Sequence, residues 1–314
     1  MEAFWGCSAL NSIAIPNSVE DFGDYTFSQC TALASVTIGE NVKRIGKSAF
    51  HTCSSLTSIV IPDSVTSIGD YAFYLCTALE SVTIGNSVED MGDYAFCQCT
   101  ALESVTIGEN VKRIGKSAFR TCSSLKSIVI PNSVTTIDKF VFHSCSSLTS
   151  ATIGNGLTHI GDWAFRECAS LSSVTIGNSV SSIGHRVFEF CSSLTTITIP
   201  SSVTSIGEGA FASCTALASI TCKAVTPPVL VFDVFNSVST DIPVYVPCVA
   251  IADYQSAVGW NYFTNFLCMD DTETDVKDVI FDSPKSTSPK LLHNGQLLII
   301  RDGKTYNVMG TQVD

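Results

Sequence analysis

The sequence predicts a β-rich solenoid of the α/β type, a curved right-handed superhelix whose strands form a parallel sheet. Three observations predict it. A cysteine recurs every 23 residues, a phenylalanine stands three residues before each cysteine, and a leucine stands three residues after it. Such a spacing indicates one supersecondary unit copied in tandem. The periodic cysteines are Cys7, Cys30, Cys53, Cys76, Cys99, Cys122, Cys145, Cys168, Cys191 and Cys214.

Each 23-residue repeat, called a coil below, indicates two short strands joined by turns. In the coil that begins at Cys53, residues 57–61 alternate outward and inward side chains, which is typical of a strand with one buried face. Pro62 ends this strand, and a second short run covers residues 65–68. One coil cannot enclose a core, so coils must stack at about 4.8 Å. All coils run in the same direction, which makes the sheet parallel.

The composition changes along the chain and divides it into four expected parts. Prolines and a run of aromatic residues follow the last regular coil, an expected helix covers residues 249–258, and an acidic, apolar-poor stretch comes after them. Two alternating runs flank Asp302 and Gly303, which indicates a hairpin. The expected parts are an array of about nine and a half coils (1–222), a C-terminal cap (223–269), an acidic and irregular linker (270–290) and a β-hairpin tail (291–314).

The periodic cysteines are predicted to be free, buried thiols. Stacked side chains point the same way, whereas a disulfide needs the two side chains to converge. A small apolar residue with a weak S–H donor suits such a column. Outside it, Cys97 occupies a variable position and is expected to face solvent, while Cys248 and Cys268 either pair with each other or stay free.

The outward positions of the main strand form a surface rich in hydroxyl groups, called the hydroxyl face. One explanation for this surface is purely structural, because serine and threonine suit a strand that faces solvent. The alternative is a docking face for a protein or glycan. The candidate partner-binding residues on it are Ser58, Ser81, Thr83, Ser104 and Thr106.

A further position carries aromatic residues in five coils and is called the aromatic stripe. Its members are Tyr25, Tyr71, Tyr94, Phe140 and Trp163. An exposed aromatic stripe favours partner binding. The alternative is that the rings lie over the turns and cover the edges of the core.

Charged pairs alternate in sign between some coils, as in Glu20-Asp21 followed by Lys43-Arg44. Opposite charges one coil apart support each other weakly and help to hold the register. The net charge of −12 and a pI near 4.7 disfavour nucleic acid as a partner. No stretch is long and apolar enough for a membrane helix.

Nothing in the sequence indicates catalysis, a metal site or a cofactor. The five histidines are scattered, no cysteine pair has zinc-ligand spacing, and no nucleophile elbow or phosphate-binding glycine loop occurs. A filled solenoid interior also offers no deep pocket. We therefore expect a non-enzyme.

The unit F-x-x-C-x-x-L-x-S-[IV]-x-I-[PG]-x-x-V-x-x-I-G-x-x-A, seen in residues 50–72, resembles the BspA-like leucine-rich repeat. Residues 4–222 follow it, and the segments 226–230, 242–247 and 252–260 resemble that family's closing segment. The resemblance implies a leucine-rich-repeat superhelix. It also implies secretion or attachment to the outer surface of a gut or oral bacterium, although no signal peptide precedes Phe4.

The same resemblance implies adhesion to a host matrix protein or to a protein of a neighbouring cell. We also expect the rod to be a monomer. We expect a non-catalytic interaction protein that binds a protein or glycan over its repeat surface. The alternatives are a structural spacer or surface-layer component, and a glycan-binding module that depends on the aromatic stripe.

Overall fold

The computed structural model describes residues 3–269, 279–281, 290–293, 296–301 and 304–307. The chain divides into two compact units, Met1–Phe266 and Leu267–Asp314. Each unit is described by itself.

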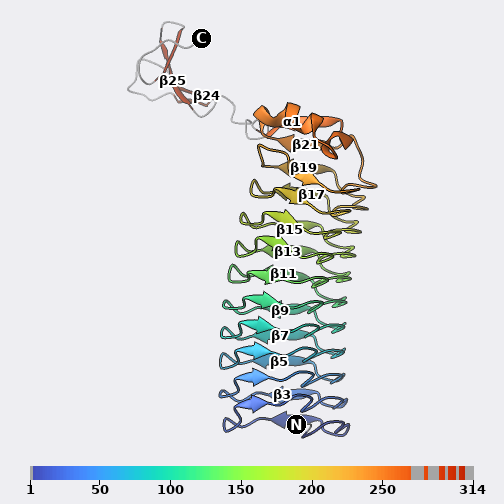
Figure 1. Ribbon diagram of the computed structural model, residues 1–314. Helices are drawn as coiled ribbons and strands as arrows, with labels where there is room; N and C mark the ends of the chain where they lie inside the picture. Colours follow the sequence, from blue (N-terminus) through green and yellow to red (C-terminus); the bar gives the residue numbers. More distant parts are fainter. Residues whose placement is uncertain (1–2, 270–278, 282–289, 294–295, 302–303, 308–314) are drawn as a thin grey trace. The chain divides into compact units, whose positions relative to one another are not determined.

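The first unit is a stack of coils with parallel strands, as predicted (Figure 1). Neighbouring main strands pair with a register offset of 23 residues, for example Ser58 with Ser81 and Val82 with Val105. The curvature and the right-handed winding stay predictions. The main strands are β1 (Ser12–Ala14), β3 (Ser35–Thr37), β5 (Ser58–Ile61), β7 (Ser81–Ile84), β9 (Ser104–Thr106), β11 (Ser127–Ile130), β13 (Ser150–Ile153), β15 (Ser173–Thr175), β17 (Thr196–Ile199), β19 (Ser219–Cys222) and β21 (Pro243–Val246).

A second ladder of two-residue strands runs along another side of the stack. Arg44 pairs with Ser67 and Arg113 with Thr136 in the same 23-residue register. These strands are β2 (Asp21–Phe22), β4 (Arg44–Ile45), β6 (Ser67–Ile68), β8 (Asp90–Met91), β10 (Arg113–Ile114), β12 (Thr136–Ile137), β14 (His159–Ile160), β16 (Ser182–Ile183), β18 (Ser205–Ile206) and β20 (Val229–Leu230).

The core is a set of columns in which equivalent side chains lie one above another. In the phenylalanine column, the rings of Phe96 and Phe119 are 5.3 Å apart and nearly parallel, and Phe142 follows 5.5 Å further on. The column runs from Phe4 to Phe211 and continues to Phe235. One coil buries its apolar edge only against the next, so the columns hold the stack together.

The periodic cysteines are free thiols, as predicted, and all but Cys7 are buried. Each buried one donates its thiol hydrogen to the phenylalanine carbonyl of the preceding coil, as Cys122 does to Phe96 at 3.2 Å. The same carbonyl also accepts the backbone N–H of Cys99. A cysteine therefore suits this position because it fills a small apolar space and also supplies a donor between coils.

This burial makes the thiols chemically inert in the folded protein. Burial raises the pKa of Cys53, Cys145 and Cys214 to about 12, so these groups stay protonated at neutral pH. We predict that a maleimide modifies Cys7 in the native protein and the other free cysteines only after unfolding. Mass spectrometry of alkylated peptides checks this, and fast native labelling at Cys122 would contradict the packed column.

The prediction that Cys97 faces solvent is wrong. Its exposure is 2%, and burial raises its thiol pKa to about 11. The equivalent residues Ser28 and His143 are also buried, with exposures of 3% and 7%. This position directly follows the buried phenylalanine. Neighbouring coils cover it where the residue is Ser28, Cys97 or His143, whereas Arg120 at the same position is exposed.

The parallel ladder continues past residue 222, where the repeat motif ends. Strand β21 pairs with β19 through Ile220 and Val244, and β20 pairs with β18. The expected helix near residues 249–258 is present as α1 (Ile251–Ser256), preceded by the 3-10 turn η1 (Cys248–Ala250). The turn η2 (Trp260–Tyr262) and β22 (Asn265–Cys268) follow.

Buried aromatic residues fill this segment. Trp260 is fully buried, donates its indole N–H to the carbonyl of Pro228 at 2.9 Å and lies 5.0 Å from the ring of Tyr254. Tyr254 in turn donates its hydroxyl to the carbonyl of Ala224. These contacts support the hypothesis that residues 223–269 close the stack. Cys248 and Cys268 are each disulfide-bonded, so neither is a free thiol.

The second unit contains an antiparallel sheet. Its strands are β23 (Val279–Phe281), β24 (Lys290–His293), β25 (Gln296–Arg301) and β26 (Lys304–Asn307), paired in that order. Strands β25 and β26 pair antiparallel on either side of residues 302–303, the position of the expected hairpin. Strand β23 falls within the stretch for which the composition indicated irregular structure, because a three-residue strand leaves little periodicity to read.

Candidate functional site

The hydroxyl face lies on the outward side of the main strands. Along β5 and β7 the exposure alternates, with outward residues exposed and inward residues buried. The predicted residues Ser58, Ser81, Thr83, Ser104 and Thr106 are all exposed. The structure thus brings the candidates together on one surface at successive coils.

This face is hollowed rather than flat. An N-terminal depression of about 610 Å³ is bounded by strand residues that include Thr83 and Thr106, and by the turn residues Asp63 and Glu109. A C-terminal depression of about 440 Å³ is bounded by Thr152, among others, and by turn residues after the strands. The turn residues that follow each proline or glycine therefore form one wall of each depression.

Interruptions in the main ladder coincide with this shape. The strands group as β1–β3, β5–β7–β9, β11–β13–β15 and then β17 onward. The last strand of each of the first three groups has three residues, and its central valine is only half-buried (Val36, Val105 and Val174). Val36 borders the N-terminal depression and Val174 the C-terminal one. The interruptions recur every 69 residues. The sequence shows the same spacing, because residues 24–50 are nearly repeated as residues 93–119.

Two exposed valines also interrupt the hydroxyl face. Val60 in β5 and Val129 in β11 have exposures of 64% and 61%, in positions that hold threonine in neighbouring strands. Val60 lies within the N-terminal depression. The face therefore offers apolar contacts as well as hydroxyl groups.

The aromatic stripe is less exposed than the face. Tyr25 is exposed, whereas the other four rings are half-buried. Tyr71 and Tyr94 stack with ring centroids 4.8 Å apart, and Phe140 and Trp163 stack at 4.7 Å. The rings of each pair cover one another, so each pair presents mainly ring edges to a partner.

The backbone at the stripe adopts the left-handed conformation, with φ between 57° and 62°. This region is uncommon for large side chains. The same position holds Ser48 and Ser117, which are buried and split the stripe into separate parts. A single sequence column therefore does not form a continuous aromatic surface.

The alternating charges form ion pairs across coils, as the sequence suggested. Arg44 contacts Asp21 at 3.2 Å, and Arg113 contacts Asp90 at 3.2 Å. Arg113 also reaches Asp138 of the following coil at 2.8 Å. These side chains are partly exposed, so each pair contributes little stability and mainly favours the correct register.

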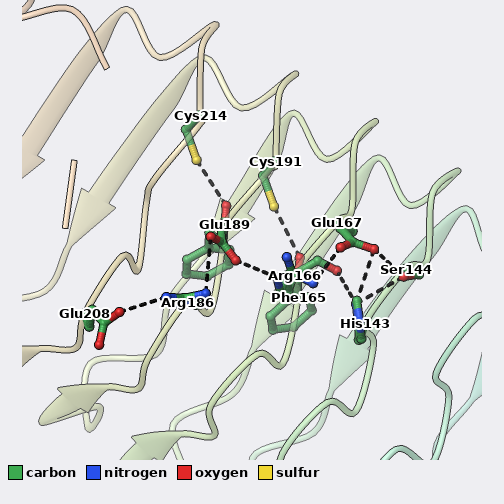
Figure 2. Close-up of polar contacts among 11 residues, drawn as sticks. His143, Ser144, Phe165, Arg166, Glu167, Arg186, Glu189, Cys191, Glu208 and Cys214 are labelled. Carbon is green, nitrogen blue, oxygen red and sulfur yellow. Dashed lines mark hydrogen bonds and ion pairs between the residues drawn. The ribbon is translucent and has the colours of Figure 1, made fainter. Parts of the chain in front are cut away.

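Sequence reasoning missed a polar cluster that joins several coils (Figure 2). Arg166 binds Glu189 and Glu167, each at 2.5 Å, and Arg186 binds Glu208 at 2.8 Å. Glu189 is buried, with an exposure of 9%. Arg166 and Glu189 lie 23 residues apart, as do Ser144 and Glu167, so each pair occupies one position in successive coils. The repeat period could therefore have placed these pairs together, whereas the contact between Arg186 and Glu208 joins two different positions.

One part of this cluster contains a serine, a histidine and a glutamate, the residue types of a hydrolytic triad. Ser144 Oγ lies 3.1 Å from His143 Nδ1 and 2.9 Å from Glu167 Oε2. His143 Nδ1 also lies 3.0 Å from the carbonyl of Arg166, which requires that nitrogen to carry a proton. It therefore cannot accept the proton of Ser144, as a triad base must. The arrangement is suited to holding coils together.

His143 gives the stack a dependence on pH. Burial lowers its pKa below the ordinary value of 6.5, so the folded protein holds it neutral where the unfolded chain binds a proton. The free energy of unfolding should then decrease as the pH falls from about 7.5 to about 5.5. We predict that His143→Gln reduces this decrease in urea titrations. The exposed His159→Gln variant is the control, and an equal effect of both would contradict the assignment.

Among the described residues, no cluster of three or more histidine, cysteine, aspartate or glutamate side chains is placed to hold a metal ion. None of the helices in that part of the chain has the length and apolarity to cross a bilayer.

Comparison with known proteins identifies the repeat. The model of the "BspA type Leucine rich repeat region" matches residues 1–126 and 112–227. No curated protein matches the chain.

Several solved structures of bacterial leucine-rich-repeat proteins are similar. One from Bacteroides ovatus is 25% identical, with 84% of this chain and 85% of that chain covered and a TM-score of 0.52. A leucine-rich cell surface protein from Faecalibacterium prausnitzii is 27% identical over 83% and 79% of the two chains, with a TM-score of 0.35. A protein from Eubacterium ventriosum is 23% identical over 82% and 80%, with a TM-score of 0.44. Because the family model matches most of the chain, this protein belongs to the BspA-type leucine-rich-repeat family.

Proposed function

We propose that this chain is a non-catalytic interaction protein that binds a partner protein through the hydroxyl face of its main strands. The observation that carries the proposal is the hollowed shape of this face, with depressions of about 610 and 440 Å³. Exposed hydroxyl groups and exposed valines lie side by side there, and protein interfaces likewise combine polar and apolar contacts. A broad surface of repeated weak contacts suits a solenoid.

We propose further that the protein acts outside the cell, as a secreted or surface-attached monomer that binds a host protein or a protein of a neighbouring cell. Membership of the BspA-type family supports this location. The disulfide-bonded Cys248 and Cys268 also favour an oxidising compartment.

The test is capture of a partner by the full chain from host matrix and epithelial extracts. A variant with Thr83→Arg, Thr106→Arg and Thr152→Arg blocks the face without touching the core. We expect saturable capture by the original chain and loss of that partner in the blocked variant. Equal capture by both proteins would place binding elsewhere, and no saturable partner would favour a structural spacer.

The aromatic stripe is the second candidate surface, and it would suit a glycan. The stacked pairs Tyr71–Tyr94 and Phe140–Trp163 support it, since their outer edges stay accessible. Replacing Tyr71, Tyr94 and Trp163 by serine tests this role. Unchanged binding of the captured partner or of a glycan would remove the stripe from consideration.

A further inference from the structure

The two depressions of the hydroxyl face differ in charge. The N-terminal depression is bordered by three carboxylates, those of Glu40, Asp63 and Glu109, and by no lysine or arginine. At the equivalent positions the C-terminal depression has the amides Asn132, Asn155 and Asn178, and it is also bordered by Lys223. The contrast within one face shows that the acidity of the N-terminal depression is a local property and not only a share of the net charge.

The three carboxylates of the N-terminal depression are exposed and available to a partner. The ion pairs among the described residues use other carboxylates, such as Asp21, Asp90 and Asp162. Asp63 also accepts the backbone N–H of Asn86 through Oδ1, which holds this turn residue against the next coil. The acidic wall is therefore outside those ion pairs, and one of its members, Asp63, is held in place by a backbone contact.

Other residues that line the same depression are apolar or carry hydroxyl groups. Val60 is 64% exposed between Thr37 and Thr83, and the half-buried Val36 lies one coil away. An aliphatic side chain of a ligand would cover Val60, and the neighbouring hydroxyl groups can accept or donate hydrogen bonds.

We propose that the N-terminal depression binds an extended basic polypeptide segment, with lysine or arginine side chains against the acidic wall and an aliphatic side chain against Val60. This inference rests on the proposed function and names its partner chemistry. Residues 40 to 109 span three coil intervals, roughly 14 Å, and six extended residues span about 20 Å. A short segment running along the stack can therefore meet all three carboxylates. Charge complementarity would also steer and orient the partner.

The test uses the full chain and a fluorescein-labelled octapeptide in which lysine alternates with serine, with one central serine replaced by valine. Matched peptides carry glutamate or glutamine in place of lysine. Fluorescence anisotropy is recorded at low and at physiological ionic strength. We expect saturable binding of the lysine peptide, weakened by salt, and none of the glutamate peptide.

The decisive variant combines Glu40→Gln, Asp63→Asn and Glu109→Gln, and the amide introduced at position 63 keeps an oxygen for the backbone contact. It should weaken lysine-peptide binding about tenfold. The matched control combines Glu20→Gln, Glu89→Gln and Asp253→Asn, which removes the same charge from exposed positions outside the depressions. Binding by this control should stay within about twofold. Circular dichroism confirms that both variants fold.

Two results would overturn the inference. One is the absence of saturable binding of the lysine peptide, and the other is equal weakening by both triple variants, which would indicate attraction to net charge alone. The lysine peptide could show no binding while the arginine-blocked variant still fails to capture the partner protein. That result would support the proposed function and contradict the inference of a basic partner. A glycan captured by the N-terminal depression in place of the peptide would also count against it.

Discussion

Replacing Phe119 by alanine should destabilise the protein by about 3–5 kcal/mol. Phe119 is fully buried and stacks between Phe96 and Phe142 in the middle of the column. The neighbouring rings belong to separate coils held at a fixed spacing, so they cannot close the resulting space. Urea unfolding followed by circular dichroism measures the loss.

The position of the change along the stack also predicts how unfolding proceeds. Each coil contacts mainly its neighbours, so a defect in the centre weakens the coupling between the two halves. We expect a broader urea transition and faster hydrogen exchange around β9 and β11. Phe119→Leu conserves most of the volume and should cost less than about 1.5 kcal/mol.

Phe4 provides the matched control at the end of the same column. Its exposure is 40%, and it stacks on Phe27 at 5.1 Å. Phe4→Ala should cost about 1 kcal/mol or less. A cost for Phe119→Ala no larger than that for Phe4→Ala would show that the column does not carry the stability of the stack.

Replacing Trp260 by alanine should also cost about 3–5 kcal/mol and should promote self-association. Trp260 has no exposed surface, and it packs against Tyr254 and Phe235. Its loss would leave a large space and orphan the Pro228 carbonyl that its indole N–H now satisfies. Urea unfolding gives the cost, and size-exclusion chromatography detects association through uncovered strand edges.

This variant tests the hypothesis that residues 223–269 close the stack. Trp260→Phe keeps a ring but loses the hydrogen bond, so an intermediate loss is expected. Val258→Ala, at a residue with 84% exposure, should change the stability by less than about 0.5 kcal/mol. If Trp260→Ala behaves like Val258→Ala and leaves hydrogen exchange in the last coils unchanged, the segment is not a cap.

Some features of the candidate site could be predicted from the repeat sequence and others could not. The outward residues of the hydroxyl face were predictable, because alternation along a strand is a local property of the backbone. The depressions were not, since Asp63 and Glu109 appear in the sequence only as polar turn residues. Their role as a wall depends on how far each turn projects beyond the neighbouring strand.

At the aromatic stripe and at Cys97, the sequence did not predict the exposure of the side chains. Both lie in turns, where the direction of a side chain depends on the sign of φ and on the coil above. Tyr71 and its equivalents have positive φ, and Cys97 is covered by neighbours that are distant in sequence. Identical spacing in the sequence therefore gave no information on exposure at these positions.

By itself, the sequence determined the repeat length, the parallel sheet, the columns of phenylalanine and free cysteine, and membership of a repeat family. These follow from a 23-residue period, because a period states which side chains must lie above one another. Only the tertiary structure decided where the main ladder is interrupted, which turn residues border a depression and how deeply the polar contacts between coils are buried. Those features depend on distances between neighbouring coils, and such distances are set by packing, which no single repeat encodes.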